Sequence, residues 1–305
     1  MTIVGQGDLV AAIVVTDLRK SYGAVEAVRG VSFQVNEGEV FGLLGPNGAG
    51  KTTIVEILEG YRQRDAGEVS VLGEDPRHPS RRLRERVGLV LQEAAIPARL
   101  SARELIDMYR GYYPKPLATD TVLGLVGLSD KADERVVRLS GGQQRRLDVA
   151  LGLVGDPELI FLDEPTTGFD PSARRNAWEV VRNMRTLGKT IVLTTHYMDE
   201  AEHLADRICV ISHGLVVAQD TPGNLRARTV GSTQIRFGLP DGVPPAELPL
   251  HPEVRDGRAL IATSTPTRTV NELTSWAVSR GLELPNLEVV RPTLEDVYLE
   301  LTADE

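Results

Sequence analysis

Short apolar runs alternate with longer amphipathic stretches between residues 13 and 228, a pattern typical of a sheet covered by helices. Leu159–Leu162 is apolar at every position, which predicts a parallel strand buried on both faces. Val31–Val35 alternates apolar and polar residues, which predicts a half-exposed antiparallel strand. We therefore expect a mixed sheet. The other predicted strands are Val40–Leu44, Val69–Leu72, Val87–Leu91, Thr190–Leu193 and Ile208–Ile211.

Two predicted helices in this region carry boundary signals. Ser101 is followed three residues later by Glu104, which is the spacing of a capping box. Asp170 and Pro171 suit an N-cap and a first helical position, and Gly188 predicts the end of that helix.

The pattern changes after Leu225, and a proline-rich stretch at residues 239–252 predicts a loop. The elements expected beyond it are a strand at Arg258–Thr263, a helix at Val270–Ser279, a strand at Leu287–Val290 and an amphipathic helix at Leu294–Leu301. The sequence therefore predicts two domains, a large one at residues 1–228 and a small α+β domain at residues 229–305.

Composition restricts the partners and the compartment. The 305 residues carry a net charge of -9, which argues against nucleic acid as a main partner because phosphate neutralisation dominates such binding. The single cysteine, Cys209, lies in an apolar run and is expected to be a buried strand thiol in a reducing cytosol. Leu9–Val15 is among the longest apolar runs, and the first basic residue is Arg19, so we expect neither a membrane span nor a signal peptide.

A phosphate-loop pattern lies between the strand Val40–Leu44 and an apolar-periodic helix that Gly60 closes. Its glycines allow backbone N–H groups to wrap phosphates, Lys51 can reach the β- and γ-phosphates, and the Thr52 hydroxyl can hold Mg²⁺. The competing interpretation is a glycine-rich turn. The expected nucleotide-binding residues are Gly45, Pro46, Asn47, Gly48, Ala49, Gly50, Lys51, Thr52 and Thr53.

Two carboxylates, Asp163 and Glu164, follow the strand Leu159–Leu162 at the edge where open α/β sheets bind ligands. Successive strand residues point in opposite directions, so the two side chains can take different roles. We expect Asp163 to orient the magnesium shell and Glu164 to polarise the water that attacks the γ-phosphate. Alternatively, both acids are solvated or cap a helix.

A second glycine pair precedes the helical stretch 145–154, in the run Ser140, Gly141, Gly142 and Gln143. Ser140 and Gln143 suffice for a capping box. The two glycines, however, weaken a helix start by about 1 kcal/mol each relative to alanine, so capping alone does not explain them. Close approach by a ligand does. The run has no lysine of its own, so we expect it to complete a site built mainly elsewhere.

Together the phosphate loop, the Leu-Ser-Gly-Gly-Gln run and the Asp163–Glu164 pair resemble the ABC transporter ATPases over about residues 13–228. The resemblance implies an α/β P-loop cassette with a mixed sheet and a helical signature subdomain. It also implies ATP and Mg²⁺ as cofactors. A homodimer is implied in which each signature run covers the ATP on its partner's phosphate loop, together with a separate membrane-spanning permease subunit.

Further residues match the family one at a time. The resemblance implies that Tyr22 stacks on adenine, that Gln92 contacts magnesium and the membrane subunit, and that His196 contacts the γ-phosphate. It makes Asp170 a dimer contact, although helix capping explains this residue equally well. Phe169 replaces the usual leucine, which leaves the dimer contacts there open. The catalytic residues implied are Lys51, Glu164 and His196.

Two segments narrow the resemblance to one branch. Residues 194–202 and 291–302 are similar to the daunorubicin-resistance type of exporter ATPases, whose chains end in a similar small domain. An exporter ATPase for a hydrophobic compound is then expected, held on the cytoplasmic face of the membrane by its permease. The alternatives are an importer ATPase and a soluble ABC protein, either a translation or repair factor or a regulatory module without turnover. Glu164 and His196 argue against the last.

Overall fold

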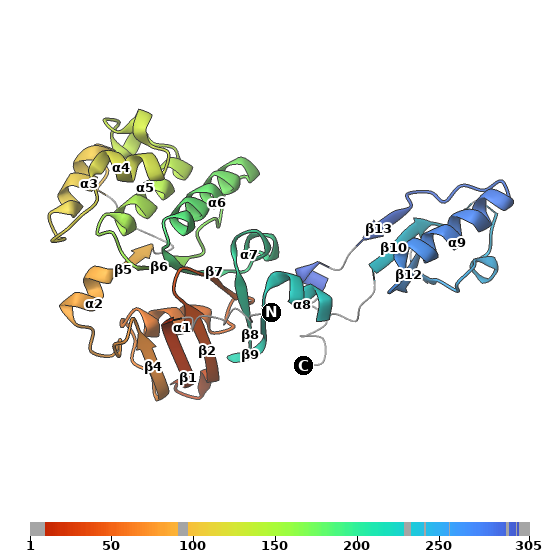
Figure 1. Cartoon of the computed structure of the whole chain (residues 1–305), viewed down its shortest axis with the longest axis horizontal. Coiled ribbons are helices and arrows are strands. Elements are labelled where there is room, and N and C mark those ends of the chain that lie inside the picture. The colour runs from red at the N-terminus through yellow and green to blue at the C-terminus, as the bar shows by residue number, and fades with distance from the viewer. Residues whose placement is uncertain are drawn as a thin grey trace, which may run out of the picture. The chain divides into compact units, whose positions relative to one another are not determined.

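The computed structural model describes residues 10–90, 97–228, 233–240, 242–255, 257–290, 293–296 and 298. The chain divides into two compact units, Met1–Pro222 and Gly223–Glu305 (Figure 1). The two units divide after Pro222, the first residue of α8 (Pro222–Arg228). The domain boundary expected from the sequence follows residue 228, the last residue of the same helix. In the described part of the chain, no helix is both long and apolar enough to span a bilayer.

A six-stranded sheet forms the centre of the first unit, in the order β5-β6-β7-β3-β8-β9. All neighbours are parallel except β8 and β9, so the predicted mixed sheet is confirmed. Cys209 lies buried within it, as expected, and burial raises the pKa of its thiol. The strands are β3 (Val40–Leu44), β5 (Val87–Val90), β6 (Leu159–Asp163), β7 (Thr190–Thr195), β8 (Arg207–Ser212) and β9 (Leu215–Asp220).

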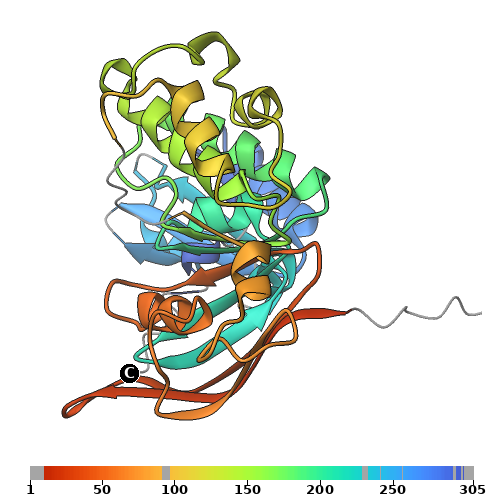
Figure 2. The ribbon, with the colours of Figure 1, turned by 90° about the vertical axis from the view of Figure 1, so that its left-hand side faces the viewer.

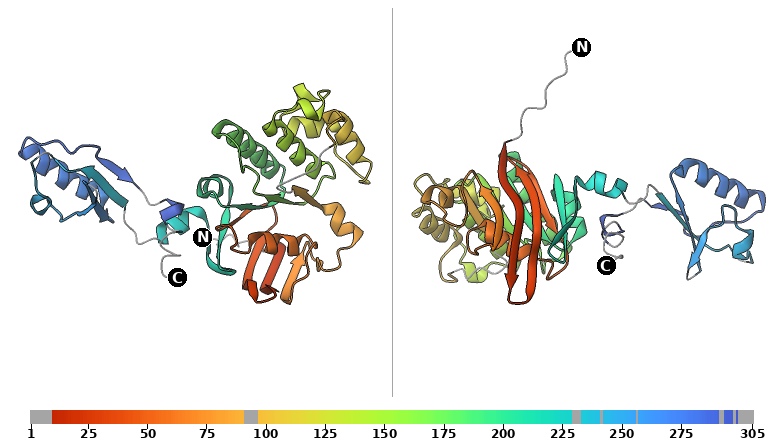
Figure 3. Two further views of the ribbon diagram at one scale, coloured as in Figure 1. Left: turned by 180° about the vertical axis from the view of Figure 1, so that it is seen from behind. Right: turned by 90° about the horizontal axis from the view of Figure 1, so that it is seen from below.

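A separate antiparallel sheet accompanies it, in the order β2-β1-β4. It contains β1 (Ala11–Tyr22), β2 (Val25–Asn36) and β4 (Ala66–Val71), and the two long strands β1 and β2 lie side by side (Figure 3). The predicted strands Val31–Val35 and Val69–Leu72 belong to this sheet rather than to the central one. Val31, Phe33 and Val35 are buried while Ser32 and Gln34 are exposed, which confirms the predicted half-exposed strand.

The central sheet separates two hydrophobic layers, because successive strand residues point to opposite faces. Ile160 and Leu162 pack into the layer of α3, α4, α5 and α6, whereas Leu159 and Phe161 face α1 and the antiparallel sheet (Figures 1 and 2). The helices of this unit are α1 (Lys51–Leu58), α2 (Arg81–Arg86), α3 (Ala102–Arg110), α4 (Thr119–Leu125), α5 (Gly141–Leu153), α6 (Pro171–Thr186) and α7 (Met198–Leu204), with 3₁₀ turns at Ser129–Lys131 and Val136–Arg138.

Both predicted helix starts are confirmed. The Ser101 hydroxyl accepts a hydrogen bond from the Glu104 N–H at 3.2 Å, and Glu104 Oε2 accepts one from the Ser101 N–H at 2.8 Å. Asp170 caps α6 by accepting from two N–H groups of its first turn, at 2.8 and 3.0 Å. Gly188 follows the end of α6 with a φ of +76°, which confirms its place after this helix.

The second unit is a four-stranded antiparallel sheet, in the order β11-β12-β10-β13, with α9 on one face. Leu273 and Ala277 of α9 pack against Ile235 and Phe237 of β10. The strands predicted at 258–263 and 287–290 and the helix at 270–279 are confirmed. In the final helix predicted at 294–301, the described residues 294–296 and 298 are helical, and the others lie outside the described residues. The elements are β10 (Thr233–Gly238), a 3₁₀ turn at Pro245–Glu247, β11 (Glu253–Arg255), β12 (Arg258–Thr263), α9 (Pro266–Ser279) and β13 (Glu288–Val290).

Candidate functional site

Three of the predicted motifs meet at one edge of the central sheet. The strands β6, β7 and β3 are neighbours and parallel, so their carboxyl ends lie side by side. Leu44 pairs with Thr195, and Asp163 pairs with Thr194. The phosphate loop, the two carboxylates and His196 follow directly from these strand ends, which is where open α/β sheets bind ligands.

The phosphate loop joins the end of β3 to the start of α1. Pro46, Asn47 and Gly48 are exposed, whereas Lys51 is 5% exposed. The Lys51 Nζ donates to the carbonyls of Gly45 at 2.7 Å and Pro46 at 3.1 Å. Burial lowers the pKa of Lys51, and the carboxylates of Glu164 and Asp163 oppose part of this shift.

Gly50 gives the loop its turn into the helix. Its φ is +105°, and a Cβ at this position would lie 2.4 Å from the Ala27 carbonyl oxygen, so no other residue fits without strain. As the N-cap of α1 it supplies no side-chain hydrogen bond, and the first turn contains no acidic residue. The N–H groups of this turn therefore remain available to an anion.

Tyr22 lies beside the start of α1, although β1 brings it from far away in the sequence. Its hydroxyl is 3.4 Å from the Thr53 hydroxyl, and the residue as a whole is 41% exposed. The guanidinium of Arg62 lies 5.1 Å from the ring centroid. The structure thus places an accessible aromatic ring next to the phosphate loop.

The two carboxylates are held by the neighbouring strand β7. The Thr194 hydroxyl donates to Asp163 Oδ1 at 2.5 Å, and the Glu164 N–H donates to the same hydroxyl at 3.0 Å. Glu164 Oε2 accepts from the Thr167 hydroxyl at 3.0 Å. Glu164 has a φ of +43°, a backbone conformation that costs a residue with a side chain about 1–3 kcal/mol and clusters at functional sites.

His196 joins this group, since its Nδ1 lies 3.2 Å from Glu164 Oε1. The imidazole packs against the ring of Tyr197, with 4.1 Å between the two centroids. Arg174, on α6, places its guanidinium 4.5 Å from the centroid of the Tyr197 ring. Tyr197, Arg174 and the bridging role of Thr194 are not among the residues predicted from the sequence. An aromatic residue directly after His196 was the only available signal for this stacking.

The predicted capping box of α5 is present. The Ser140 N–H donates to Gln143 Oε1 at 2.8 Å, and the Gln143 N–H donates to the Ser140 hydroxyl at 3.3 Å. A Cβ built on Gly141 would meet no atom of the described residues within 4 Å, and one on Gly142 would be 3.6 Å from the Ala173 Cβ. Packing among the residues that the structure describes therefore does not require either glycine.

A cavity of about 530 Å³ lies between the start of α5 and the segment that follows β6 and contains Glu164. Its lining includes Gly141 and Gly142 on one side and Glu164, Phe169 and Asp170 on the other. Hydrogen bonds from the backbone N–H groups of Ala173 and Ser172, in the first turn of α6, lower the pKa of Asp170. Asp170 thus serves as a helix cap and also faces the cavity.

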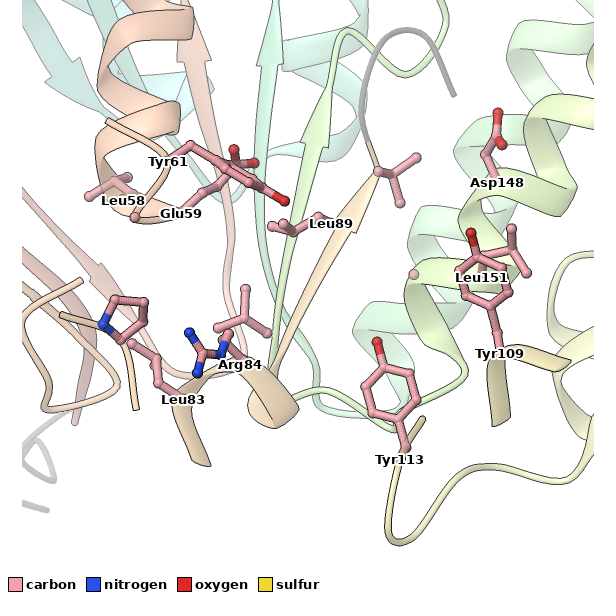
Figure 4. A pocket seen from close by; sticks show the side chains of 15 residues that line it. Leu58, Glu59, Tyr61, Leu83, Arg84, Leu89, Tyr109, Tyr113, Asp148 and Leu151 are labelled. Carbon is pink, nitrogen blue, oxygen red and sulfur yellow. The ribbon is translucent and has the colours of Figure 1, made fainter. Parts of the chain in front are cut away.

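A second cavity, of about 500 Å³, lies between the end of α1 and the helical layer (Figure 4). Glu59 lines it from the α1 side, and Tyr109, Tyr113 and Asp148 line it from the α3 and α5 side. Burial raises the pKa of Glu59 to about 8, and burial raises the pKa of Asp148 to about 6 although Arg145 opposes that shift. Gln92 lies outside the described residues.

Comparison with known proteins gives the family. A model described as ABC transporter matches residues 28–167, and a model of the C-terminal domain of ABC transporter domain-containing proteins matches residues 233–293. The Nod factor export ATP-binding protein I of Sinorhizobium fredii is 40% identical over 96% of this chain and 87% of its own length. The chain belongs to the ABC transporter ATP-binding family.

One further relative and one solved structure are also similar to this chain. The daunorubicin resistance ATP-binding protein DrrA3 of Streptomyces coeruleorubidus is 38% identical over 96% of both chains. The solved structure of CbiO1 from Clostridium perfringens is 28% identical, with a TM-score of 0.64 over 72% of this chain and 91% of that one. The chain is thus an ATPase of the ABC type that binds ATP, and the predicted cassette fold is confirmed.

Proposed function

We propose that this chain is the ATP-hydrolysing motor of an ABC exporter that moves a drug, a lipid or another hydrophobic compound. Two observations support export. Relatives at 38–40% identity carry names of export and drug-resistance proteins, and they match this chain over both of its units. The clustering of Lys51, Asp163, Glu164 and His196 at one sheet edge is the observation that carries the ATPase chemistry.

We assign each site residue a part in hydrolysis. The backbone of the loop 45–53 and Lys51 bind the phosphates, and the Tyr22 ring stacks on adenine. Thr52 and Asp163 offer the hard oxygen ligands that suit Mg²⁺, and Gln92 is proposed as a third. Bound Mg²⁺ would neutralise charge on the phosphates. Glu164 orients or deprotonates the attacking water, and His196, in contact with Glu164, faces the γ-phosphate.

A homodimer would complete each nucleotide site. The open space at Gly141 supports this proposal, because close approach by a second molecule explains a glycine that its own chain does not need. Ser140, Gly141, Gly142 and Gln143 would cover the ATP bound by the partner, and Asp170 would lie at the contact. We assign residues 1–228 to the ATP-binding cassette and residues 229–305 to an accessory domain.

The membrane partner is proposed to be a separate permease subunit, which would hold this chain at the cytoplasmic face. The lining of the cavity between α1 and the helical layer includes Val90, the last described residue before the segment that contains Gln92. A docking surface there would contact both layers of the cassette. Movement of the helical layer would then reach the permease.

Phosphate release from Mg-ATP tests the assignment. Lys51→Ala should bind ATP more weakly and lose turnover, because Lys51 Nζ contacts the carbonyls of the loop and supplies a positive charge there. The variant should keep the circular dichroism spectrum of the wild type. Unchanged hydrolysis by a folded Lys51→Ala protein would contradict the phosphate-loop assignment.

Export of hydrophobic compounds needs its own test in cells. Cells without this chain should retain ethidium longer than cells with it, and the Glu164→Gln variant should fail to restore efflux. Equal retention in all three strains would count against export of compounds of this kind.

A further inference from the structure

We propose that Thr194 is a positioning residue for ATP hydrolysis, with one hydroxyl that fixes both carboxylates of the site. The inference rests on the proposed roles of Asp163 and Glu164. Thr194 lies on β7 directly opposite Asp163 on β6 and is 1% exposed. No solvent competes for its hydroxyl, so the hydroxyl direction is set by the two residues that it contacts.

The hydroxyl uses its donor and an acceptor at the same time. Its hydrogen goes to Asp163 Oδ1 at 2.5 Å, and its lone pair accepts the Glu164 N–H at 3.0 Å. The bond to Asp163 occupies Oδ1 and so limits rotation of the carboxylate, which fixes the position of Oδ2 as well. Hydrogen bonds to an ionised group are shorter and roughly twice as strong as neutral ones, so this bond is effective in orienting Asp163.

The bond from Glu164 acts on the backbone. Glu164 adopts a φ of +43°, and its N–H also lies 3.2 Å from the Thr194 carbonyl oxygen. Both acceptors belong to one residue, so β7 holds the strained turn at the point where the two side chains separate. Relaxation of this φ would move the Glu164 carboxylate away from Thr167 and His196.

The same strand provides a matched control. Thr190, at the other end of β7, is 3% exposed, and its hydroxyl accepts the Gly38 N–H at 2.9 Å. Thr190→Val therefore removes a buried hydrogen bond from the same strand without contact to either carboxylate. Thr194→Val has the same shape change and removes the two bonds to the site.

The first measurement is amide hydrogen exchange without nucleotide, followed in peptides that cover residues 159–168. Thr194→Val should exchange faster than the wild type at Glu164, because its N–H keeps only the carbonyl acceptor. Thr194→Ser should exchange like the wild type, and so should Thr190→Val. This comparison does not depend on activity.

The second measurement is steady-state hydrolysis as a function of Mg²⁺ and ATP concentration. Loss of residues that orient metal ligands costs about 10–100-fold in metal affinity or activity. We expect Thr194→Val to lower kcat about 10-fold or more and to raise the Mg²⁺ midpoint about 10-fold, with little change in Mg-free ATP binding. Thr194→Ser should restore most of both, and Thr190→Val should leave both near the wild type.

Wild-type kcat and exchange in Thr194→Val would overturn the inference, as would an equal loss of kcat in Thr190→Val. Lys51→Ala and Glu164→Gln are measured in parallel. If those two variants hydrolyse ATP normally, the proposed function itself fails. If they lose turnover while Thr194→Val keeps it, only the role of Thr194 is refuted.

Discussion

Arg145 links the N-terminal half of α5 to the end of β6. Its replacement tests whether this contact holds α5 against the strand end that carries Asp163 and Glu164. Its side chain is 11% exposed, and its Nη2 donates to the Asp163 carbonyl at 3.0 Å. Its Nη1 lies 3.8 Å from Asp148 Oδ2. We expect Arg145→Met, which keeps the length of the side chain and removes its charge, to destabilise the first unit.

The magnitude follows from the separation and the burial. Opposite charges 3.8 Å apart attract by about 4 kcal/mol at an effective dielectric constant of about 20. Removal of one partner from a buried pair costs about 3–5 kcal/mol, because the other charge stays behind. Asp148 is 12% exposed, and its Oδ1 has no hydrogen-bond partner among the described residues, so its charge would lose the partner at 3.8 Å while remaining largely buried.

The loss of folding stability in Arg145→Met must depend on pH. Burial raises the pKa of Asp148 to about 6 against the opposition of Arg145, so loss of Arg145 should raise that pKa further. A raised folded pKa means that the folded state binds the proton more tightly, and stability falls as pH rises through that window. We expect Arg145→Met to lose about 3–5 kcal/mol at pH 8 and clearly less at pH 5.5, where Asp148 takes up a proton.

Urea unfolding followed by circular dichroism at the two pH values measures this difference. Asp148→Asn in the Arg145→Met background removes the ionisable group and should recover most of the loss at pH 8. Asp148→Asn alone is the matched control. A loss that is independent of pH, or a double variant as unstable as Arg145→Met at pH 8, would refute the reasoning.

Three further outcomes are expected. Gly141→Ala meets no atom within 4 Å and should raise thermal stability slightly, by up to about 1 kcal/mol, yet lower ATPase activity; unimpaired turnover would contradict the dimer contact. Glu59 has a pKa of about 8 against an ordinary 4.5, so Glu59→Gln should unfold at higher urea than the wild type at pH 9 but not at pH 4; equal midpoints at pH 9 would refute the burial of its charge. Removal of residues 229–305 should leave a folded, ATP-binding cassette that fails to support transport, and normal transport in cells would oppose a coupling role for these residues.

The sequence contains the residue types of the proposed site but not the contacts between them. Residue types at fixed spacing identify the phosphate loop and the acidic pair, because the chemistry needs those side chains in that order. The contact of Thr194 with Asp163 and Glu164 depends on the register between β6 and β7, across about thirty intervening residues. Single-sequence patterns contain no signal for such a register.

The missed strands have physical reasons as well. β1 contains several register shifts against β2, so its apolar residues do not keep a strict period of two. In β10, Gln234 and Arg236 alternate with the buried Ile235 and Phe237, and the short run gave too few positions to establish this alternation from the sequence. The buried Arg145 was equally hidden, since an arginine in a helix is ordinarily solvated.

The central claim is that Glu164 enables hydrolysis in a nucleotide-bound dimer, and Glu164→Gln tests it most directly. The change keeps the shape of the side chain and removes the carboxylate that lies 3.2 Å from His196 Nδ1. Phosphate release should fall about 10²–10⁴-fold while ATP still binds. Size exclusion with light scattering should then show a dimer with Mg-ATP and a monomer without it, since ATP that is not consumed keeps the two chains together. Near-normal phosphate release by Glu164→Gln would contradict the account.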